Sequence, residues 1–378
     1  MNAWRDAWFD FGDAAYMNVA AQGPMPRVAV RAVQQALEWK KFPQLIPDDT
    51  YFGLPDRVRA SLAKILGVQA SDIAITTGTS SGLAAIASGL EWEPDDEVLI
   101  AKGEFPAHFA AFVPLAQAGK LRVKIVEPRG RFIDADDFIE RIGPRTRLVS
   151  ASLVRFDNAV RLDSARVAAA CHQRQALIAV DIAQCAGAMP MDAASLGADF
   201  LTGSAYKWLL GPYGTGFLWV RPEHIAQMRA SPFYWMAVDG AAEFHTLPAG
   251  NFQLAPGARR WDSPETASFF NLAALDASLQ FLVGLGVATV WEHIQRLIAE
   301  IIARMPLDRC VLASPAHADS RGPYICIAAR KQENTPLLYD RLRDAGVFVS
   351  LREGALRIAP HLYNSERDID RLLSVLAV

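Results

Sequence analysis

The sequence has few cysteines, and they lie far apart. Only four occur in 378 residues, and none forms a C-x-x-C pair: Cys171, Cys185, Cys310 and Cys326. A disulfide framework or a zinc ribbon is therefore not expected, whereas a reducing, cytoplasmic environment is. H-E-x-x-H and clustered metal ligands are also missing, so no metal site is predicted.

Charge of one sign and long apolar runs are scarce as well. The chain has 38 basic and 41 acidic residues, a net charge of −3, and neither sign collects in a tail. This balance disfavours a nucleic-acid-binding protein, which needs a basic face. The apolar runs are too short and interrupted to span a bilayer, and the first residues lack the basic region of a signal peptide. We therefore expect a soluble cytoplasmic protein, with neither nucleic acid nor membrane as a partner.

The sequence does contain a regular alternation of short apolar runs and longer helical patterns. Seven runs are predicted to be strands: "SDIAITTG", "DEVLIA", "LRVKIVE", "TRLVSASLV", "ALIAVDIA", "ADFLTGSA" and "GTGFLWV". Near-continuous apolar strands that alternate with helices are typical of a mostly parallel sheet with both faces covered. The predicted fold class is α/β, with a large domain built on a mostly parallel, seven-stranded sheet.

The alternation loosens after about residue 222 and gives way to an α+β pattern near the end. There a long helical stretch leads to mixed strands and helices, including two predicted strands on either side of Gly354. We predict three parts, namely an N-terminal segment (1–20) that packs on the small domain and active site, a large domain (21–255) and a small C-terminal α+β domain (256–378).

One lysine has an unusually apolar setting. In "TGSAYKWLLGPYGTGF", Lys207 lies between Tyr206 and Trp208, after a predicted strand and a glycine-rich turn. Shielding from water lowers a lysine pKa from its usual value of about 10.4, and the neutral amine forms Schiff bases with carbonyls. A single lysine of this kind more often only extends its amine to water, so further groups are needed to support a catalytic role.

Two further stretches place polar groups at the same predicted sheet edge. Asp181 ends a buried strand, where a carboxylate is costly unless it meets a cation such as a protonated pyridine nitrogen, and Gln184 is able to donate to a phenolate oxygen on the same ring. Gly78, Thr79 and Ser80 open a predicted helix, whose N–H groups bind phosphate. Helix capping alone explains either stretch separately. Together with the lysine, they predict a site for pyridoxal 5′-phosphate.

With these residues the chain resembles the class V aminotransferases, fold-type I pyridoxal phosphate enzymes that include cysteine desulfurases, kynureninases and isopenicillin N epimerases. The resemblance runs from "YMNVAAQGPMP" to "LRIAPHLYNSERDID", nearly the whole chain. It implies that Lys207, in a stretch similar to the family's "G-H-K-W/L-x-x-G-P-x-G-x-G", carries the cofactor as a Schiff base. It also implies an amino-acid substrate and a homodimer with composite active sites.

The resemblance implies roles for other residues too. Phe105 stacks on the cofactor ring, where desulfurases usually have histidine, and Thr266 in "WDSPETASFF" reaches the partner subunit's phosphate. Arg357 binds the substrate carboxylate through its guanidinium fork, and Arg352 and Ala21 are further substrate-binding residues. The implied cofactor-binding residues are Gly78, Thr79, Ser80, Phe105, Asp181, Gln184, Ser204, Tyr206, Lys207 and Thr266.

One departure from the family bears on the reaction. Desulfurases carry a mobile cysteine shortly before the arginine, whereas "RDAGVFVSLREGALRIAP" has none and Cys326 lies upstream in an apolar strand pattern. A persulfide-forming desulfurase is therefore disfavoured. We expect Lys207 to remove the Cα proton as a general base, leading to transamination or epimerisation. A C–S or β-lyase, or a kynureninase-like hydrolase, is the alternative.

A different enzyme class fits one motif. "GTSSG" matches the G-x-S-x-G nucleophile elbow, with Ser80 as nucleophile and His293 or His361 as its partner. That interpretation leaves the lysine, aspartate and arginine unexplained. "GPYGTG" precedes a strand and so does not indicate a dinucleotide loop. His108 and His172 lie on helical patterns and are interpreted as structural, and a non-enzymatic relative that keeps the fold is a third possibility.

Overall fold

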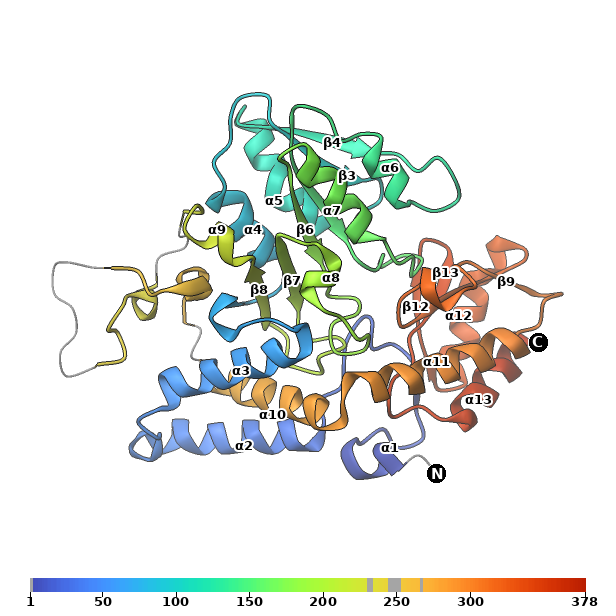
Figure 1. Ribbon diagram of the computed structural model, residues 1–378. Helices are drawn as coiled ribbons and strands as arrows, with labels where there is room; N and C mark the ends of the chain where they lie inside the picture. The colour runs from blue at the N-terminus through green and yellow to red at the C-terminus, as the bar shows by residue number, and fades with distance from the viewer. Residues whose placement is uncertain (1–2, 230–233, 244–252, 266–267) are drawn as a thin grey trace.

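The computed structural model describes residues 3–229, 234–243, 253–265 and 268–378. Figure 1 shows a large lobe around a central sheet and a smaller lobe that carries the C-terminus. Thr266 lies outside the described residues, so its predicted role remains a prediction.

The large lobe is built on a seven-stranded sheet with the order β2-β8-β7-β6-β5-β3-β4. Every strand except β8 runs in the same direction. The strands are β2 (Ile73–Thr76), β3 (Glu97–Ala101), β4 (Arg122–Val126), β5 (Thr146–Ser152), β6 (Leu177–Asp181), β7 (Phe200–Ser204) and β8 (Gly216–Val220). Each of the seven predicted apolar runs contains one of them, and the α/β fold with a mostly parallel sheet is confirmed.

The sheet carries a hydrophobic cluster on each face. Within β3, for example, Val98 and Ile100 belong to one cluster and Leu99 to the other, because successive strand residues point to opposite faces. This explains why the inner strands are buried along nearly their whole length, whereas the edge strand β4 is largely exposed. One face packs on α4 (Thr79–Gly89), α5 (Pro106–Gln117) and α9 (Pro222–Ile225), and the other on α3 (Thr50–Leu66), α6 (Ala135–Ile139), α7 (Ser164–Gln173) and α8 (Ala193–Leu196).

A layer of three helices lies along the large lobe (Figure 1). In it, α10 (Phe269–Leu285) packs against α2 (Arg27–Lys41) and α3. The chain then bends by 78° at Gly286 into α11 (Val287–Arg304). The predicted domain boundary at residue 256 assigns α10 to the small domain, whereas its packing joins it to α2 and α3. The exact division of the chain stays a prediction.

Among the described helices, none is by itself both long and apolar enough to cross a membrane, and α10 with α11 meets that test only as a bent pair.

The small lobe has a four-stranded sheet with the order β12-β13-β10-β9. The β12–β13 hairpin turns at Glu353 and Gly354, which both have positive φ (45° and 75°). The elements are β9 (Cys310–Leu312), β10 (Ile325–Ala329), α12 (Thr335–Asp344), β12 (Ser350–Arg352), β13 (Ala355–Ile358) and α13 (Glu366–Leu376).

The N-terminal segment connects the two lobes. After α1 (Ala3–Trp8), strand β1 (Ala15–Tyr16) pairs in parallel with β11 (Val347–Phe348) of the small lobe. The carbonyl of Ala20 then accepts a hydrogen bond from Gln184 of the large lobe at 3.2 Å. The chain up to residue 20 therefore contacts both lobes.

Candidate active site

Several predicted residues come together where β2, β6 and β7 end. The backbone N–H of Thr79 donates to Ser204 Oγ at 3.0 Å, and Thr79 Oγ1 donates to Asp181 Oδ1 at 3.2 Å. Thr79 lies more than 100 residues before both Asp181 and Ser204 in the sequence. They lie at the carboxyl edge of the strands, where open α/β sheets bind their ligands.

The turn between β2 and α4 requires glycine. Gly78 has φ = 152°, and a Cβ there would lie 3.1 Å from Ser204 Oγ. On β8, a Cβ at Gly216 would come within 2.5 Å of the Gly78 Cα. This close approach of two backbones brings the start of α4 to the sheet edge, with Ser80 exposed in its first turn. A helix N-terminus with hydroxyl side chains in this position suits a phosphate group.

Asp181 is buried, but only one of its carboxylate oxygens is well satisfied. Oδ1 accepts from the Ala183 N–H at 2.8 Å and from Thr79. Within the described part of the chain, the nearest cationic group to Oδ2 is His108 Nε2 at 3.8 Å, beyond hydrogen-bond distance. A buried carboxylate oxygen with this spare capacity fits a protonated ring nitrogen.

Lys207 is buried, with 7% of its surface exposed. Its Nζ lies 5.4 Å from the centre of the Phe105 ring and 5.5 Å from that of Tyr206. Burial lowers the pKa of Lys207 to about 8; Asp181 opposes this shift, and Arg357 and Arg352 add to it. The amine is thus neutral in a larger fraction of molecules near neutral pH than an ordinary lysine, and the neutral form is the one that nucleophilic chemistry requires.

The backbone around Lys207 is fixed by the segment that follows Ala21. Ala21 itself is half-buried, and the N–H of Gly23 donates to the Tyr206 carbonyl at 2.7 Å. A Cβ at Gly23 would lie only 2.0 Å from the Lys207 carbonyl oxygen, so a larger residue there displaces the lysine loop. The N-terminal segment therefore helps to position the nucleophile.

Arg357 lies on β13 and is 2% exposed. One guanidinium nitrogen donates to the Phe156 carbonyl at 3.0 Å, while Nε has no hydrogen-bond partner among the described residues. Burial lowers the pKa of Arg357. Arg352 is exposed, but its charge acts on both Lys207 and Arg357, so it lies in the same neighbourhood. A buried guanidinium with spare donors suits a substrate carboxylate.

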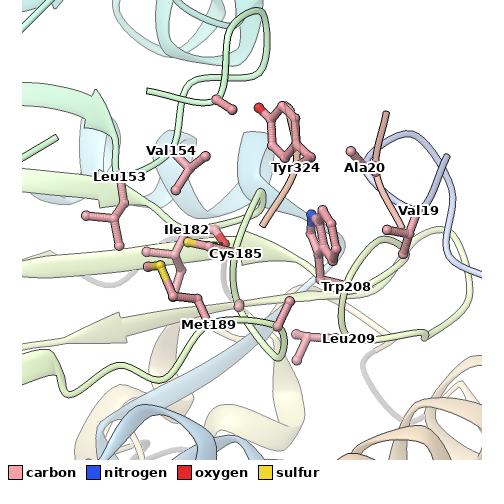
Figure 2. Packing of buried hydrophobic residues seen from close by; sticks show 14 of the residues in the cluster. Val19, Ala20, Leu153, Val154, Ile182, Cys185, Met189, Trp208, Leu209 and Tyr324 are labelled. Carbon is pink, nitrogen blue, oxygen red and sulfur yellow. Dashed lines mark hydrogen bonds between the residues drawn. The ribbon is translucent and has the colours of Figure 1, made fainter. Parts of the chain in front are cut away.

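Gln184 makes contacts that the sequence did not indicate. Its amide nitrogen donates to the Ala20 carbonyl, and its oxygen accepts from Trp208 Nε1 at 3.3 Å. The Trp208 ring packs beside Tyr324, with ring centres 6.3 Å apart (Figure 2). Gln184 therefore keeps one amide hydrogen for a ligand, and its orientation is fixed by Trp208. Trp208 was not predicted as a site residue, and the feature of the sequence that could have indicated it is its position directly after Lys207.

The serine hydrolase interpretation finds no support in the geometry. His293 bonds to the Asn364 carbonyl at 3.1 Å. His361 is fully buried near Trp208, and burial lowers its pKa to about 3. Among the described residues, neither histidine makes a hydrogen bond to Ser80. Ser80 consequently lacks the base that a nucleophilic serine needs.

All four cysteines are buried. Cys326 lies on β10, where its Sγ donates to the Asp157 carbonyl at 3.2 Å, and burial raises its pKa to about 12. Such a thiol is protonated and unreactive. The described residues also contain no cluster of histidine, cysteine, aspartate and glutamate able to hold a metal ion.

The residues at this edge match the functional groups of pyridoxal 5′-phosphate. Lys207 offers an amine, Asp181 a free carboxylate oxygen, Phe105 a ring face, and the start of α4 a phosphate site. Together with the mostly parallel sheet, they define a fold-type I pyridoxal phosphate-dependent enzyme. More particularly, residues 54–372 match the family Aminotransferase class-V, and the chain belongs to this family. Its cofactor is pyridoxal 5′-phosphate.

Similar proteins cover nearly the whole chain. Isopenicillin N epimerase of Streptomyces clavuligerus is 25% identical over 381 residues, covering 95% of this chain and 93% of that protein. Kynureninase of Deinococcus radiodurans is 29% identical over 399 residues, covering 99% and 92%. Among solved structures, a mutant of C-DES with glycine covalently linked to its PLP cofactor has a TM-score of 0.88 at 22% identity, covering 99% and 98% of the two chains. A complex of C-DES, a cystine C-S lyase, with cysteine persulfide has a TM-score of 0.86.

Proposed function

We propose that this protein is a pyridoxal phosphate-dependent enzyme that removes the Cα proton of an α-amino acid, with transamination as its reaction. The observation that carries the proposal is the buried Lys207 amine, whose pKa is lowered to about 8 and which interacts electrostatically with both Asp181 and Arg357. An amine of this pKa is a good general base near neutral pH.

Each residue has a defined task in this proposal. When bound, the cofactor supplies an electron sink for the electron pair left at Cα. Arg357 binds the substrate carboxylate and so orients the Cα–H bond, while Lys207 takes the proton. Asp181 keeps the ring nitrogen protonated. Phe105 covers the ring and excludes water, and its side chain has no proton to give or take.

The choice between transamination and epimerisation depends on the available acids and bases. With phenylalanine as the stacking residue, Lys207 is the base that this edge offers, and a single base favours proton return to the cofactor. One observation favours epimerisation as the second candidate. Tyr206 is half-buried beside Lys207, and its hydroxyl can supply a second proton. Burial raises the pKa of Tyr206, so the hydroxyl stays protonated.

The test begins with Lys207→Ala. The variant is expected to lose the borohydride-reducible link to the cofactor and to react slower by a factor of about 10²–10⁴. Lys102→Ala is the matched control, because Lys102 is exposed and pairs with Glu127 on the surface. A protein–cofactor adduct that borohydride still reduces in the Lys207→Ala protein would overturn the proposal.

The parent holoprotein is then screened against amino acids, followed by its visible spectrum. Keto-acid production that depends on an added acceptor keto acid indicates transamination, and loss of optical activity indicates epimerisation. Release of sulfide or of a cleaved side chain instead places the protein with the C–S lyases or with kynureninase-like hydrolases, and contradicts the proposal.

We further propose that the enzyme works as a homodimer. Large apolar side chains are exposed along α2, the segment after it and the first turn of α3, namely Val30, Leu37, Phe42, Leu45 and Tyr51. Exposed apolar side chains gathered in one region are typical of an interface. Light scattering of the purified protein is expected to give twice the chain mass of 41.3 kDa.

A further inference from the structure

His108 occupies an unusual place behind the cofactor site. It lies on α5, has no exposed surface, and contacts polar groups of β5. Its Nδ1 is 2.8 Å from Ser150 Oγ, and its Nε2 is 3.5 Å from Ser152 Oγ and 3.8 Å from Asp181 Oδ2. A fully buried histidine next to a cofactor-binding carboxylate affects the electrostatics of that carboxylate as well as the packing.

A second carboxylate, that of Glu104, interacts electrostatically with the same histidine. Glu104 accepts from the Ser152 hydroxyl at 2.9 Å and from the Ser152 N–H at 3.1 Å. Arg155 approaches Glu104 at 3.7 Å. The side chains of Arg155, Glu104, His108, Asp181 and Lys207 thus form a buried series in which basic and acidic groups alternate. Buried charges are tolerated when each meets a group of opposite charge.

The surroundings of His108 favour its protonated form. Burial opposes a charge on the imidazole, but Glu104 and Asp181 together outweigh burial and raise the pKa of His108, against a smaller opposing effect of Arg155. A protonated imidazole donates from both ring nitrogens. The Nδ1–H is then directed to Ser150, and the charge interacts with both carboxylates.

The 3.8 Å distance to Asp181 matters for the cofactor. It is within ion-pair range but too long for a hydrogen bond, so His108 supplies positive charge without occupying Oδ2. The other oxygen of Asp181 is held by Thr79 and Ala183. Asp181 is therefore fixed on one side and electrostatically balanced on the other, with Oδ2 left for the ring nitrogen.

We propose that His108 is a positioning residue that balances the charge of Asp181 and keeps its carboxylate oriented toward the cofactor ring, with Glu104 and Ser152 holding His108 in place. The proposal rests on the cofactor site and is independent of which amino acid reacts. A failure of the amino-acid screen therefore does not contradict the proposed role of His108. Conversely, a failure of the His108 experiments does not contradict the proposed reaction.

The test uses the pH midpoint of the visible absorbance change of the bound cofactor, which reports the proton on the Lys207 nitrogen. His108→Gln keeps a polar amide but removes the positive charge, so the nearby carboxylates hold that proton more tightly. The midpoint is expected to rise by about one pH unit. Ser150→Ala is the matched control, because it removes a buried hydrogen bond to His108 and no charge. Its midpoint is expected to stay at the parent value.

A double variant distinguishes charge from packing. Glu104→Gln in the His108→Gln background removes the compensating negative charge, so the midpoint is expected to return toward the parent value. Equal midpoints in the parent protein and in His108→Gln would overturn the proposal, because His108 is then a neutral structural residue. A rise in His108→Gln that the double variant does not reverse would also overturn it, since packing is then responsible.

A further measurement does not need the bound cofactor. Proton NMR titration of the histidines in the apoprotein, assigned by comparison with His108→Gln or His108→Asn, is expected to give a His108 pKa above the ordinary value of about 6.5. A His108 pKa below that value contradicts the proposal whatever the variants do.

Discussion

Two buried aspartates lie at opposite ends of neighbouring strands, Asp199 at the amino end of β7 and Asp181 at the carboxyl end of β6. They differ in how many of their carboxylate oxygens have hydrogen-bond partners. Asp199, just before β7, accepts from the Ile178 N–H at 2.8 Å and from His172 and His224 at 3.0 Å, and it lies 3.3 Å from Arg221 Nε. At the carboxyl edge, Asp181 has one oxygen paired in this way and one left for a ligand.

The difference separates a structural carboxylate from a functional one. Around Asp199, the chain itself supplies every donor, so the charge stabilises the fold and is closed to ligands. Around Asp181, the chain leaves one carboxylate oxygen without a donor. This is unfavourable in a buried site unless the cofactor supplies the missing donor. The presence of a large cavity does not by itself identify the functional carboxylate. A cavity of about 940 Å³ opens on the Asp199 side of the sheet, lined by Arg145, Arg147 and Arg174, yet none of the predicted cofactor residues lines it.

Of the substitutions that test the contrast between Asp181 and Asp199, one at Asp181 is expected to have the largest effect, which is on the reaction rate. Asp181→Asn removes the negative charge and keeps the size, so the ring nitrogen loses its proton and the electron sink weakens. We expect the rate to fall about 10³-fold, with little change in thermal stability. Single-turnover kinetics and calorimetry on the same sample check this. An equal loss in stability would make Asp181 a structural residue like Asp199.

Asp199→Asn is expected to give the converse result. The amide leaves the buried Ile178 N–H and the ring nitrogens of His172 and His224 poorly matched to their buried partner, and we expect the free energy of unfolding to fall by about 3 kcal/mol. Urea denaturation measures the loss. Turnover per folded molecule is expected to stay at the parent value, and a selective loss of turnover would contradict the contrast.

Arg357 has a buried hydrogen-bond donor without a partner among the described residues, as Asp181 has a free acceptor oxygen. A substitution at Arg357 tests whether this donor binds the substrate. Arg357→Lys keeps the charge but removes the planar fork, so KM for the amino acid is expected to rise about 10- to 100-fold. Arg352→Lys, at an exposed position, is the control and is expected to change KM much less. Steady-state kinetics at saturating cofactor separate the two.

The smallest effect is the pH dependence of stability. Burial acts to raise the pKa of Asp199, but hydrogen bonds from His224, His172 and the Ile178 N–H outweigh it and hold the pKa below its usual value. Folded protein thus binds fewer protons here than the unfolded chain. The stabilisation is complete above the unfolded pKa of about 3.9 and is lost as the pH falls through the lower folded-state pKa. Urea midpoints between pH 6 and pH 3, roughly the range over which carboxylates titrate, are expected to fall more steeply for the parent than for Asp199→Asn.

The elements of the fold were predictable where the signal was local. Apolar runs of strand length, the glycine turn at Gly78 and the setting of Lys207 are properties of neighbouring residues, so the seven strands and the nucleophile candidate could be found in the sequence. The pairing of α10 with α2 and α3 was not visible there, because it joins segments more than 200 residues apart.

The sequence by itself determined which chemical groups this protein has and where along each strand they occur, because strand period, turn residues and an apolar-flanked lysine are encoded within a few positions. Only the tertiary structure decided which of those groups meet. Thr79 reaches Asp181, Trp208 fixes Gln184, and His108 comes to interact with both Glu104 and Asp181 through the packing of α5 on the sheet. Hydrogen bonds and charges act over a few ångströms, so the sequence positions alone could not show them.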